Sequence, residues 1–441
     1  MSNSPFTVGI YTLGCKVNQY ESEAIAEELI RLGAKITSPT SPCDAYLINT
    51  CTVTAESDRK ARQFIRRAIS KNPNAVIGVT GCLAQSGTDS LCRIQGIHVI
   101  VGNAEKLKIA SEIADMVRSG ERPASAKVYV SPIDEAGFEQ MNITRFDRTR
   151  AYVKIEDGCE NKCTYCIIPS ARGHVRSKDP DCVINEVTCL CKNGCKEVVL
   201  TGIETASYGK DLSDMTLSKL LLRVEGIEGI GRVRLGSLDP SLISESFADG
   251  IRDLKSLAPH FHLSLQSGSS RILALMKRKY NADQAMAAIG RLRDRIPLVQ
   301  FTTDVIVGFP DETEEDFEKT CQFVKEARFL QVHVFPYSKR GGTPAASMKG
   351  QIPEEVKKER LHKLQAIVDG IRREILEEKI SSSPVCHVLF ETYKEGVATG
   401  HTPEFIEVSV KSDRPLHAEI REVRLTHTDG VICYGELSDV Q

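Results

Sequence analysis

Apolar runs and helical spacing alternate along the first 120 residues of the chain. Four short apolar runs predict strands, at 7–11, 45–50, 75–81 and 98–102. Residues 23–30 between the first two runs carry the spacing of an amphipathic helix, and a basic helical segment follows the second run. Strands that alternate with helices favour a parallel sheet with helices on its faces. Residues 1–120 are therefore predicted to form an amino-terminal α/β domain.

The same alternation repeats about six times between residues 151 and 380. Predicted strands lie near 151–156, 197–201, 232–237, 261–265, 299–307 and 330–335. Helical segments separate them, near 182–192, 215–225, 241–254, 281–294 and 314–327. Such a series predicts a partial parallel (β/α) barrel, in which functional groups gather at the carboxyl ends of the strands.

The pattern changes again towards the end of the chain. Residues 353–379 are helical and highly charged, and Ser381-Ser382-Ser383-Pro384 marks a boundary. Short β-like runs follow, at 385–390, 397–401, 405–410, 420–426 and 431–434. Residues 381–441 are therefore predicted to form a small β-barrel. Residues 121–150 are turn-rich with little periodicity and are predicted to link the first domain to the second.

Composition narrows the class of protein. With 441 residues, 41% hydrophobic and 26% charged, the chain has the composition of a globular protein with two or three domains. Its net charge of −2 means that any RNA or DNA site must be a local basic patch. The amino terminus lacks the pattern of a signal peptide, and no apolar run approaches ~18 residues. We expect a cytoplasmic protein whose 15 cysteines are kept reduced, with some available for metal.

Three cysteines lie together directly after the first predicted barrel strand. Cys159, Cys163 and Cys166 have the spacing C-x3-C-x2-C. Three thiolates can hold three irons of a [4Fe–4S] cube and leave the fourth iron free to bind another ligand. The alternatives are a chance triplet or half of a zinc knuckle, but zinc sites normally pair two such motifs and no partner pair follows. The loop is expected at the mouth of the barrel, where barrel active sites are built.

Three further cysteines each lie just past a predicted strand of the first domain. They are Cys15, Cys51 and Cys82. Because the carboxyl ends of parallel strands meet at one edge of a sheet, these cysteines are expected to converge. The alternative is three small buried side chains, since free cysteine is often buried. Their equivalent positions favour a second metal site.

The helix after Cys51 is basic. Arg59, Arg62 and Arg66 share one helical face by their spacing. They are candidates to bind RNA phosphates beside the second metal site, and the alternative is an ordinary solvated helix face.

The chain resembles the radical S-adenosylmethionine (SAM) methylthiotransferases over nearly its whole length. The resemblance is carried by residues 11–19, 49–53, 81–82, 153–166 and 168–173. It implies two [4Fe–4S] clusters, one on Cys159, Cys163 and Cys166 that cleaves SAM, and one on the strand-end cysteines that carries or donates sulfur. It also implies that the carboxy-terminal barrel is an RNA-binding TRAM domain.

SAM contacts are also implied by the resemblance rather than by spacing. The candidates are Tyr165, Gly202, Glu204, Ser237, Gln266, Arg278 and Asp304. Glu204 departs from the family pattern, which more often has histidine after Thr201-Gly202-Ile203. No catalytic residue beyond the cluster ligands stands out from the sequence.

Within the family, residues 12–19 and 200–203 most resemble the branch that acts on threonylcarbamoyladenosine in tRNA. The expected reaction adds a methylthio group to carbon 2 of N6-threonylcarbamoyladenosine at tRNA position 37, using two SAM. A radical cofactor suits this reaction because an aromatic C–H bond offers no acidic proton. The expected partners are the tRNA anticodon stem-loop, an electron donor and a sulfur donor, with no membrane.

Two other interpretations of the sequence remain. The same chemistry could act on isopentenyladenosine in tRNA or on an aspartate of a ribosomal protein. A protein of another class, a non-enzymatic iron–sulfur or zinc RNA-binding protein, would also use the cysteines. That second class does not explain six strand–helix units behind a cysteine loop.

Overall fold

The computed structural model of the chain describes residues 5–146 and 148–438. In its amino-terminal part, parallel strands form one sheet in the order β2-β1-β3-β4-β5-β6. They are β1 (Phe6–Thr12), β2 (Ala34–Thr37), β3 (Ala45–Thr50), β4 (Val76–Gly81), β5 (Val99–Val101) and β6 (Lys127–Tyr129). Every residue of the central strands β3 and β4 is buried, as expected where helices cover both faces.

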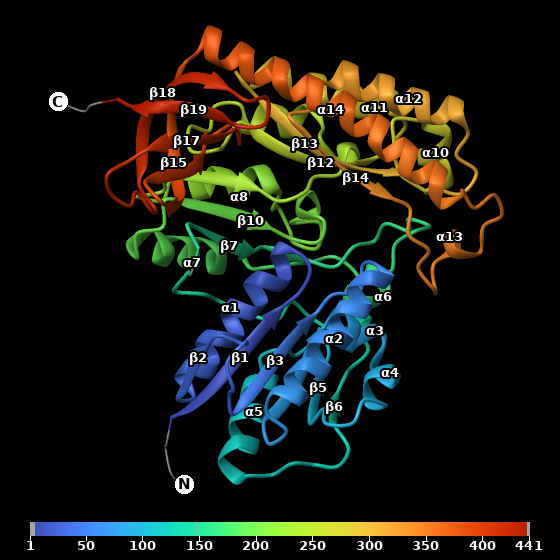
Figure 1. Cartoon of the computed structure of the whole chain (residues 1–441), viewed down its shortest axis with the longest axis vertical. Helices are drawn as coiled ribbons and strands as arrows, with labels where there is room; N and C mark the ends of the chain where they lie inside the picture. Colours follow the sequence, from blue (N-terminus) through green and yellow to red (C-terminus); the bar gives the residue numbers. More distant parts are fainter. Residues whose placement is uncertain (1–4, 147, 439–441) are drawn as a thin grey trace.

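Helices cover this sheet on its two faces (Figure 1). They are α1 (Lys16–Arg31), α2 (Ala55–Lys71), α3 (Cys82–Ser86), α4 (Thr88–Cys92) and α5 (Lys108–Ser119). The apolar sides of α1 and α5 form one core with the sheet, and the apolar side of α2 forms the other. The parallel α/β domain expected from the sequence is confirmed. β6 lies within the stretch 121–150 that was predicted to be a linker, and it pairs with β5.

The central part of the chain is an open barrel. Its strands are β7 (Arg150–Lys154), β10 (Glu197–Thr201), β11 (Arg232–Leu235), β12 (His260–Gln266), β13 (Gln300–Val307) and β14 (Gln331–Pro336). They form two parallel three-stranded sheets, and isolated bridges between 233 and 257 and between 238 and 263 join β11 to the β12 side. No pairing joins β7 to β14 among the described residues, so the barrel is open between them. The partial barrel expected from the sequence is confirmed.

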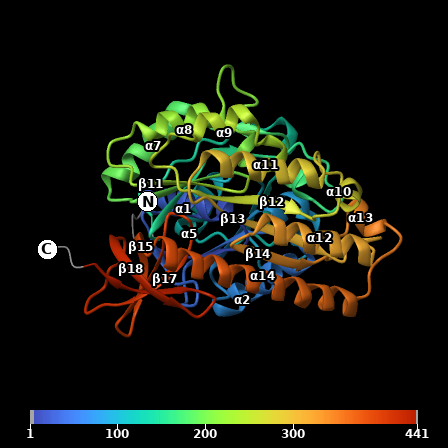
Figure 2. The same cartoon turned by 90° about the horizontal axis from the view of Figure 1, so that it is seen from above.

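The barrel helices lie in an arc around these strands (Figure 2). They are α7 (Pro180–Lys192), α8 (Leu217–Glu225), α9 (Glu245–Ile251), α10 (Ser270–Leu275), α11 (Ala282–Arg295) and α12 (Glu314–Ala327). Two of them begin with reciprocal capping boxes, formed by Asn281 with Gln284 and by Thr313 with Asp316. Short elements line the mouth of the barrel: β8 (Glu156–Asp157), α6 (Ile168–Arg172), β9 (Arg176–Ser177) and α13 (Pro344–Ser347).

The carboxy-terminal part begins with the long helix α14 (Glu354–Ser382), which packs along β14 and α12. A closed barrel follows, in the order β15-β16-β17-β19-β18. Its strands are β15 (Val385–Lys394), β16 (Val397–His401), β17 (Glu407–Lys411), β18 (Ile420–Thr428) and β19 (Cys433–Leu437). The small β-barrel predicted from five β-like runs is confirmed. No helix of the described residues is long and apolar enough to cross a membrane.

The three parts share buried surface. Tyr20 and Ala24 of α1 belong to the core of the central barrel rather than to the core of their own sheet. The hydroxyl of Tyr20 donates to the carbonyl oxygen of Met141 at 2.5 Å and lies 3.0 Å from Glu186 on α7. At the floor of the barrel, Arg150 pairs with Glu391 of β15 at 2.5 Å. The packing of Tyr20 and Ala24 holds α1 against β7, at one edge of the open side (Figure 1), and the Arg150–Glu391 pair joins β7 to the carboxy-terminal barrel.

Candidate functional site

The strand-end cysteines of the first domain lie on three adjacent strands. Cys15 follows β1 and precedes α1, Cys51 directly follows β3, and Cys82 is the first residue of α3 after β4. Gly14, at a φ of +98°, lets the backbone beside Cys15 come close to Cys51. A Cβ on Gly14 would lie only 2.8 Å from the Cβ of Cys51 and 2.9 Å from its sulfur. The predicted convergence of these cysteines at one sheet edge is therefore what the fold produces.

Their thiols interact with one another. Burial raises the pKa of Cys15 and raises that of Cys51 to about 11, and the charge of Cys82 adds to both shifts. Cys51 and Cys82 are buried, whereas Cys15 keeps accessible surface. Thiolates crowded together in this way are favoured only when a cation binds them, which is the condition of a metal site.

The second cysteine group is a loop that the surrounding backbone holds in place. The Cys159 N–H donates to the carbonyl oxygen of Gly173 at 2.9 Å, and the Thr164 N–H donates to that of Met276 at 3.1 Å. Burial raises the pKa of Cys159 to about 12 and that of Cys166 to about 11. Cys163 is buried, and the other two thiols are half-buried. This group also keeps one side open to solvent.

A buried arginine donates a hydrogen bond to one sulfur of each group. The Nε of Arg172 lies 3.3 Å from Cys82 Sγ, and the Nη1 of Arg278 lies 3.3 Å from Cys163 Sγ. Hydrogen bonds from cations to sulfur ligands stabilise the anionic form of the ligand and tune the cluster that it holds. In each cysteine group, one sulfur thus accepts a hydrogen bond from an arginine, although the two groups lie in different domains.

Arg172 is also the centre of a fully buried ionic network between the first two domains. Its Nη1 donates to Glu21 of α1 at 2.6 Å and to Asp157 of β8 at 3.1 Å. Lys106 and Lys154 pair with Glu21 as well. Burial works against the charge of Glu21, yet Arg172 and the two lysines hold the pKa of Glu21 well below its usual range. The network fixes the strand-end cysteines relative to the Cys159 loop, because Asp157 lies two residues before Cys159.

Each cysteine group offers three thiols, which is a donor set that iron–sulfur clusters use. No group of three His, Cys, Asp or Glu side chains in residues 5–146 and 148–438 lies close enough to hold one metal ion. Three thiolates can hold three irons of a [4Fe–4S] cluster and leave the fourth iron open. All 15 cysteines are free thiols, which leaves both groups available as ligands.

The residues predicted to contact SAM occupy different depths of the barrel. Glu204 follows β10 and accepts hydrogen bonds from the Asn161 side chain at 3.3 Å and from the backbone N–H of Asp239 at 3.2 Å. Burial and the charge of Asp239 raise the pKa of Glu204 to about 7. Arg278 pairs with the same Asp239 at 2.7 Å. The structure therefore brings Glu204 and Arg278 together beside the Cys159 loop.

The other predicted SAM contacts lie around this centre. Tyr165 packs edge-on against Phe309 with ring centroids 6.4 Å apart. A Cβ on Gly202 would lie 2.4 Å from a carboxylate oxygen of Glu156, so the position requires glycine. Ser237 follows β11 half-buried, and Gln266 ends β12 at a φ of +69°. Asp304 lies in the middle of β13, where it is 3.4 Å from His262, deeper in the barrel than the others.

Arg172, Glu156 and Lys106 were not singled out by the sequence as site residues. Arg172 lies in a segment that carries the family resemblance, but its burial and its contact with Cys82 depend on how the domains meet. Spacing along the chain gives no signal of such a contact.

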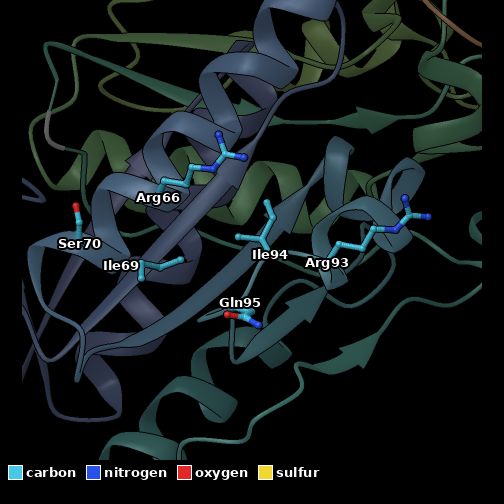
Figure 3. Close-up of a pocket in the computed structure, with 6 residues that line it drawn as sticks. All are labelled: Arg66, Ile69, Ser70, Arg93, Ile94 and Gln95. Atoms are coloured by element: carbon cyan, nitrogen blue, oxygen red, sulfur yellow. The ribbon is translucent and has the colours of Figure 1, made fainter.

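The basic helix α2 presents its arginines unevenly. Arg59 is exposed and pairs with Glu56 at 2.6 Å, and Arg62 donates to Ser90 at 3.1 Å. Arg66 lines a shallow hollow that α2 forms with residues 93–95 (Figure 3). Arg93 lines the same hollow and adds a second cation to it. The three predicted RNA contacts thus lie on one helix, with Arg66 the freest to meet a phosphate.

Known proteins match the chain in both of its cysteine-bearing parts. The family model of the radical SAM superfamily matches residues 153–324, and that described as uncharacterized protein family UPF0004 matches residues 7–102. The radical SAM methyltransferase TsrM from Kitasatospora setae shares the fold with a TM-score of 0.56 at 16% identity, over 78% of this chain and 77% of that one. At this identity the likeness shows the fold alone.

Curated relatives match almost end to end. A threonylcarbamoyladenosine tRNA methylthiotransferase MtaB from Bacillus subtilis (strain 168) is 41% identical, covering 95% of this chain and 93% of the relative. The MtaB of Thermotoga maritima is 36% identical, covering 97% and 96%. A tRNA-2-methylthio-N(6)-dimethylallyladenosine synthase from Aquifex aeolicus (strain VF5) is 34% identical, covering 98% of both. With two cysteine groups on the expected domains and relatives of this identity along its whole length, the chain belongs to the radical SAM methylthiotransferase family.

Proposed function

We propose that this chain is a tRNA methylthiotransferase that adds a methylthio group to carbon 2 of N6-threonylcarbamoyladenosine at tRNA position 37. Relatives that carry the corresponding name are 34–41% identical, and three of them are 36% or more. Dimethylallyladenosine synthases, at 34% identity, supply the second candidate substrate. The observation that carries the reaction type is the proximity of the two cysteine groups: Arg172 donates to Cys82 Sγ at 3.3 Å and to Asp157, two residues before Cys159, at 3.1 Å.

Each group would hold one [4Fe–4S] cluster, on Cys15, Cys51 and Cys82 and on Cys159, Cys163 and Cys166. When bound, the second cluster supplies the electron that cleaves SAM into a carbon radical, and the first supplies a place for the sulfur that is transferred. Arg172 and Arg278 would hold one ligand sulfur of each cluster through their N–H groups.

The remaining residues at the mouth would bind and orient SAM. Glu204 would accept a hydrogen bond from the ammonium group of SAM, since its carboxylate already faces Asn161 of the Cys159 loop. Gly202 would allow close approach of the ligand to the backbone after β10. Tyr165 would pack beside the adenine, with Phe309 behind it. Burial of these groups would exclude water from the reacting carbon.

RNA contact is assigned to α2 rather than to the carboxy-terminal barrel. Residues 384–441 hold five Lys or Arg against ten Asp or Glu, so that barrel is a poor general RNA binder. Arg59, Arg62 and Arg66 would bind phosphates of the anticodon stem-loop near Cys51. An electron donor and a sulfur donor complete the set of proposed partners. The reduced thiols and the tRNA substrate both suit a cytoplasmic location.

Iron counting tests the two sites separately. Anaerobically reconstituted protein is expected to hold about eight irons, and alanine replacement of either cysteine triplet is expected to leave about four. Alanine at Cys189 and Cys191, both on α7, is the matched control and is expected to change nothing. If removing Cys15, Cys51 and Cys82 leaves the iron count unchanged, these three cysteines do not hold a cluster.

Substrate choice is tested with short RNA anticodon stem-loops. Reduced holoenzyme with SAM is expected to methylthiolate a stem-loop that carries threonylcarbamoyladenosine, with 5′-deoxyadenosine released. Turnover only on dimethylallyladenosine RNA, or only on ribosomal protein, would replace the proposed substrate. Absence of any SAM cleavage by the reduced protein would exclude radical catalysis.

A further inference from the structure

Phe335, the residue before the last one of β14, leaves its aromatic ring exposed. All 14 phenylalanines and 11 tyrosines lie in the part of the chain that the structure describes, and among them only Phe335 is exposed, at 50%. Aromatic side chains normally bury their large apolar area. A single exposed apolar residue is ordinary on an outer surface. What this ring can bind therefore depends on where it lies.

The sheet β12-β13-β14 has one buried face and one accessible face. Phe301, Val305 and Val332 belong to a core that helices α12 and α14 share, so they lie on the outer face of the barrel. Side chains alternate between the two faces of a strand. The residues that alternate with these face the inside of the barrel and keep accessible surface: His262, Ser264, Asp304, Ile306, His333 and Phe335. Solvent thus reaches the inner face of this sheet, whereas the inside of a closed (β/α) barrel is filled by packed side chains.

Two histidines continue the row of rings from Phe335 across this inner face. The ring centroids of Phe335 and His333 are 6.4 Å apart, and those of His333 and His262 are 6.2 Å apart. His333 is exposed as well. His262 is fixed by Asp304 at 3.4 Å and by the hydroxyl group of Thr302 at 2.9 Å. The exposed rings of β14 thus begin an aromatic surface that a held imidazole completes.

The segment after β14 places this surface between the two cysteine groups. Arg340 donates at 2.5 Å to the hydroxyl oxygen of Thr52, which directly follows a cysteine of the first group. The backbone N–H of Ala345 donates to the carbonyl oxygen of Thr164 in the Cys159 loop at 2.8 Å. These two contacts come five and ten residues after the exposed ring. β14 therefore ends where the two groups meet, and it is the edge strand beside the opening of the barrel.

The flat face of a nucleobase suits this surface. Proteins hold unpaired bases by stacking them on exposed aromatic rings, those of Phe and His included. An enzyme that reacts at a carbon of a base takes that base out of its stack, and the extruded base is then stacked on side chains of the protein. The register partner of Phe335 on β13 is Ile306, so the surface is apolar at this point and offers no cation to a phosphate.

We infer that Phe335, with His333 beside it, stacks on the adenine that is to be modified once this base has left the anticodon stem-loop. The inference rests on the proposed function, because it requires an adenine in RNA as the substrate. It holds for a threonylcarbamoyl and for a dimethylallyl substituent alike. Stacking fixes the plane of the base and thereby the direction in which carbon 2 points.

Equilibrium binding of short anticodon stem-loops to the unreduced holoenzyme tests the inference without turnover. One probe carries threonylcarbamoyladenosine at position 37, the second an abasic site at 37, and the third an abasic site at 38. Phe335→Ala is expected to weaken the first and third probes roughly 5- to 100-fold and to leave the second unchanged. Phe335→Tyr keeps the ring and should keep most of the affinity.

Two further variants make the comparison secure. Leu298→Ala is the matched control, because Leu298 is 59% exposed and precedes β13 at the end of the same sheet that lies away from the mouth. It should bind all three probes as the wild type does. Iron content is measured for every variant. If Phe335→Ala does not fold, Phe335→Leu replaces it, since leucine keeps apolar volume but has no flat ring to stack on a base.

The probes separate stacking from other roles of the ring. If the variant without the ring binds all three probes as tightly as the wild type, or weakens all three equally, Phe335 does not hold the modified base and the inference is wrong. If the loss of affinity disappears with the abasic site at 38 instead of 37, the stacked base is a neighbour of the modified one. Loss of SAM binding in the absence of RNA would assign the ring to SAM.

Failure of the proposed function has a different signature. In that case the reduced wild-type holoenzyme would modify no tRNA stem-loop, whatever the substituent on adenine 37. Turnover of threonylcarbamoyladenosine RNA that is unchanged in Phe335→Ala, together with equal binding of the three probes by wild type and variant, would refute only the role of Phe335.

Discussion

Replacing Arg172 by methionine is expected to loosen the junction between the first domain and the central barrel. The guanidinium is fully buried and donates to Glu21, Asp157, Asn18 and Cys82. Methionine fills a similar volume without any donor. The two carboxylates would then remain buried with fewer cations, which is the costly way to break a buried ion pair.

The size of the destabilisation depends on the ion pairs that remain after Arg172 is replaced. Breaking a buried pair by removing one partner costs roughly 3–5 kcal/mol. Lys106 and Lys154 still pair with Glu21, so we expect the lower end, about 3 kcal/mol. At 1.4 kcal/mol for each factor of ten, this corresponds to roughly 100-fold in the equilibrium for local opening.

Hydrogen–deuterium exchange on the metal-free full-length chain measures this opening, because exchange reports local stability in a multidomain protein. Amides of both α1 and α6 are expected to exchange roughly 100-fold faster in Arg172→Met. Arg31→Met is the control on the same helix α1, since Arg31 is 70% exposed and pairs with Glu28 on the surface of that helix. Such a solvent-exposed surface pair contributes little to stability. Faster exchange in α6 alone, or equal effects of the two variants, would refute a network that joins the domains.

Three other predictions follow from the structure. Gly14→Ala should lower the iron content by about half, because its Cβ would clash with Cys51, whereas Gly120→Ala has open space and should keep it. The pKa of Glu197 is about 2 against an ordinary 4.5, because Arg234, Arg150 and Arg232 outweigh its burial. Its contribution of about 3 kcal/mol is present above pH 4.5 and is lost as the pH falls towards 2. The difference in unfolding free energy between wild type and Glu197→Gln should therefore shrink over that range, and a constant difference would contradict the shift. Arg66→Glu should weaken tRNA binding and reduce the salt dependence by about one phosphate contact, measured by titration at several salt concentrations.

Much of the fold is predictable from the sequence because its elements are long or strongly patterned. The barrel strands and five of the barrel helices appear within a few residues of their expected bounds, since these strands contain apolar runs and these helices have an apolar stripe. The six-residue helix α10 was not predicted. β6 was not predicted, because it has three residues in a turn-rich stretch and pairs only at the sheet edge. Such a strand depends on a neighbour rather than on its own pattern.

The sequence also predicts some residues of the candidate site and not others. The six cysteines are recognisable because their spacing and their positions after strands can be read from the chain. The role of Arg172 cannot be read from it, because its contacts with Asn18 and Glu21 depend on α1 packing against the central barrel. A buried lysine or arginine has the same letter as an exposed one, and only the fold shows which charges lack a partner.

The packing of Tyr20 and Ala24 into the core of the central barrel has a consequence for protein engineering. Exchanging whole domains between relatives is a common way to move substrate specificity from one enzyme to another. Here the first domain brings with it part of its neighbour's core, including the hydroxyl that meets Met141 and Glu186. A chimera cut at residue 120 would join two surfaces that evolved with other partners. Functional chimeras should therefore require Glu186 and the barrel residues that share a core with Tyr20 and Ala24 from the same parent as α1.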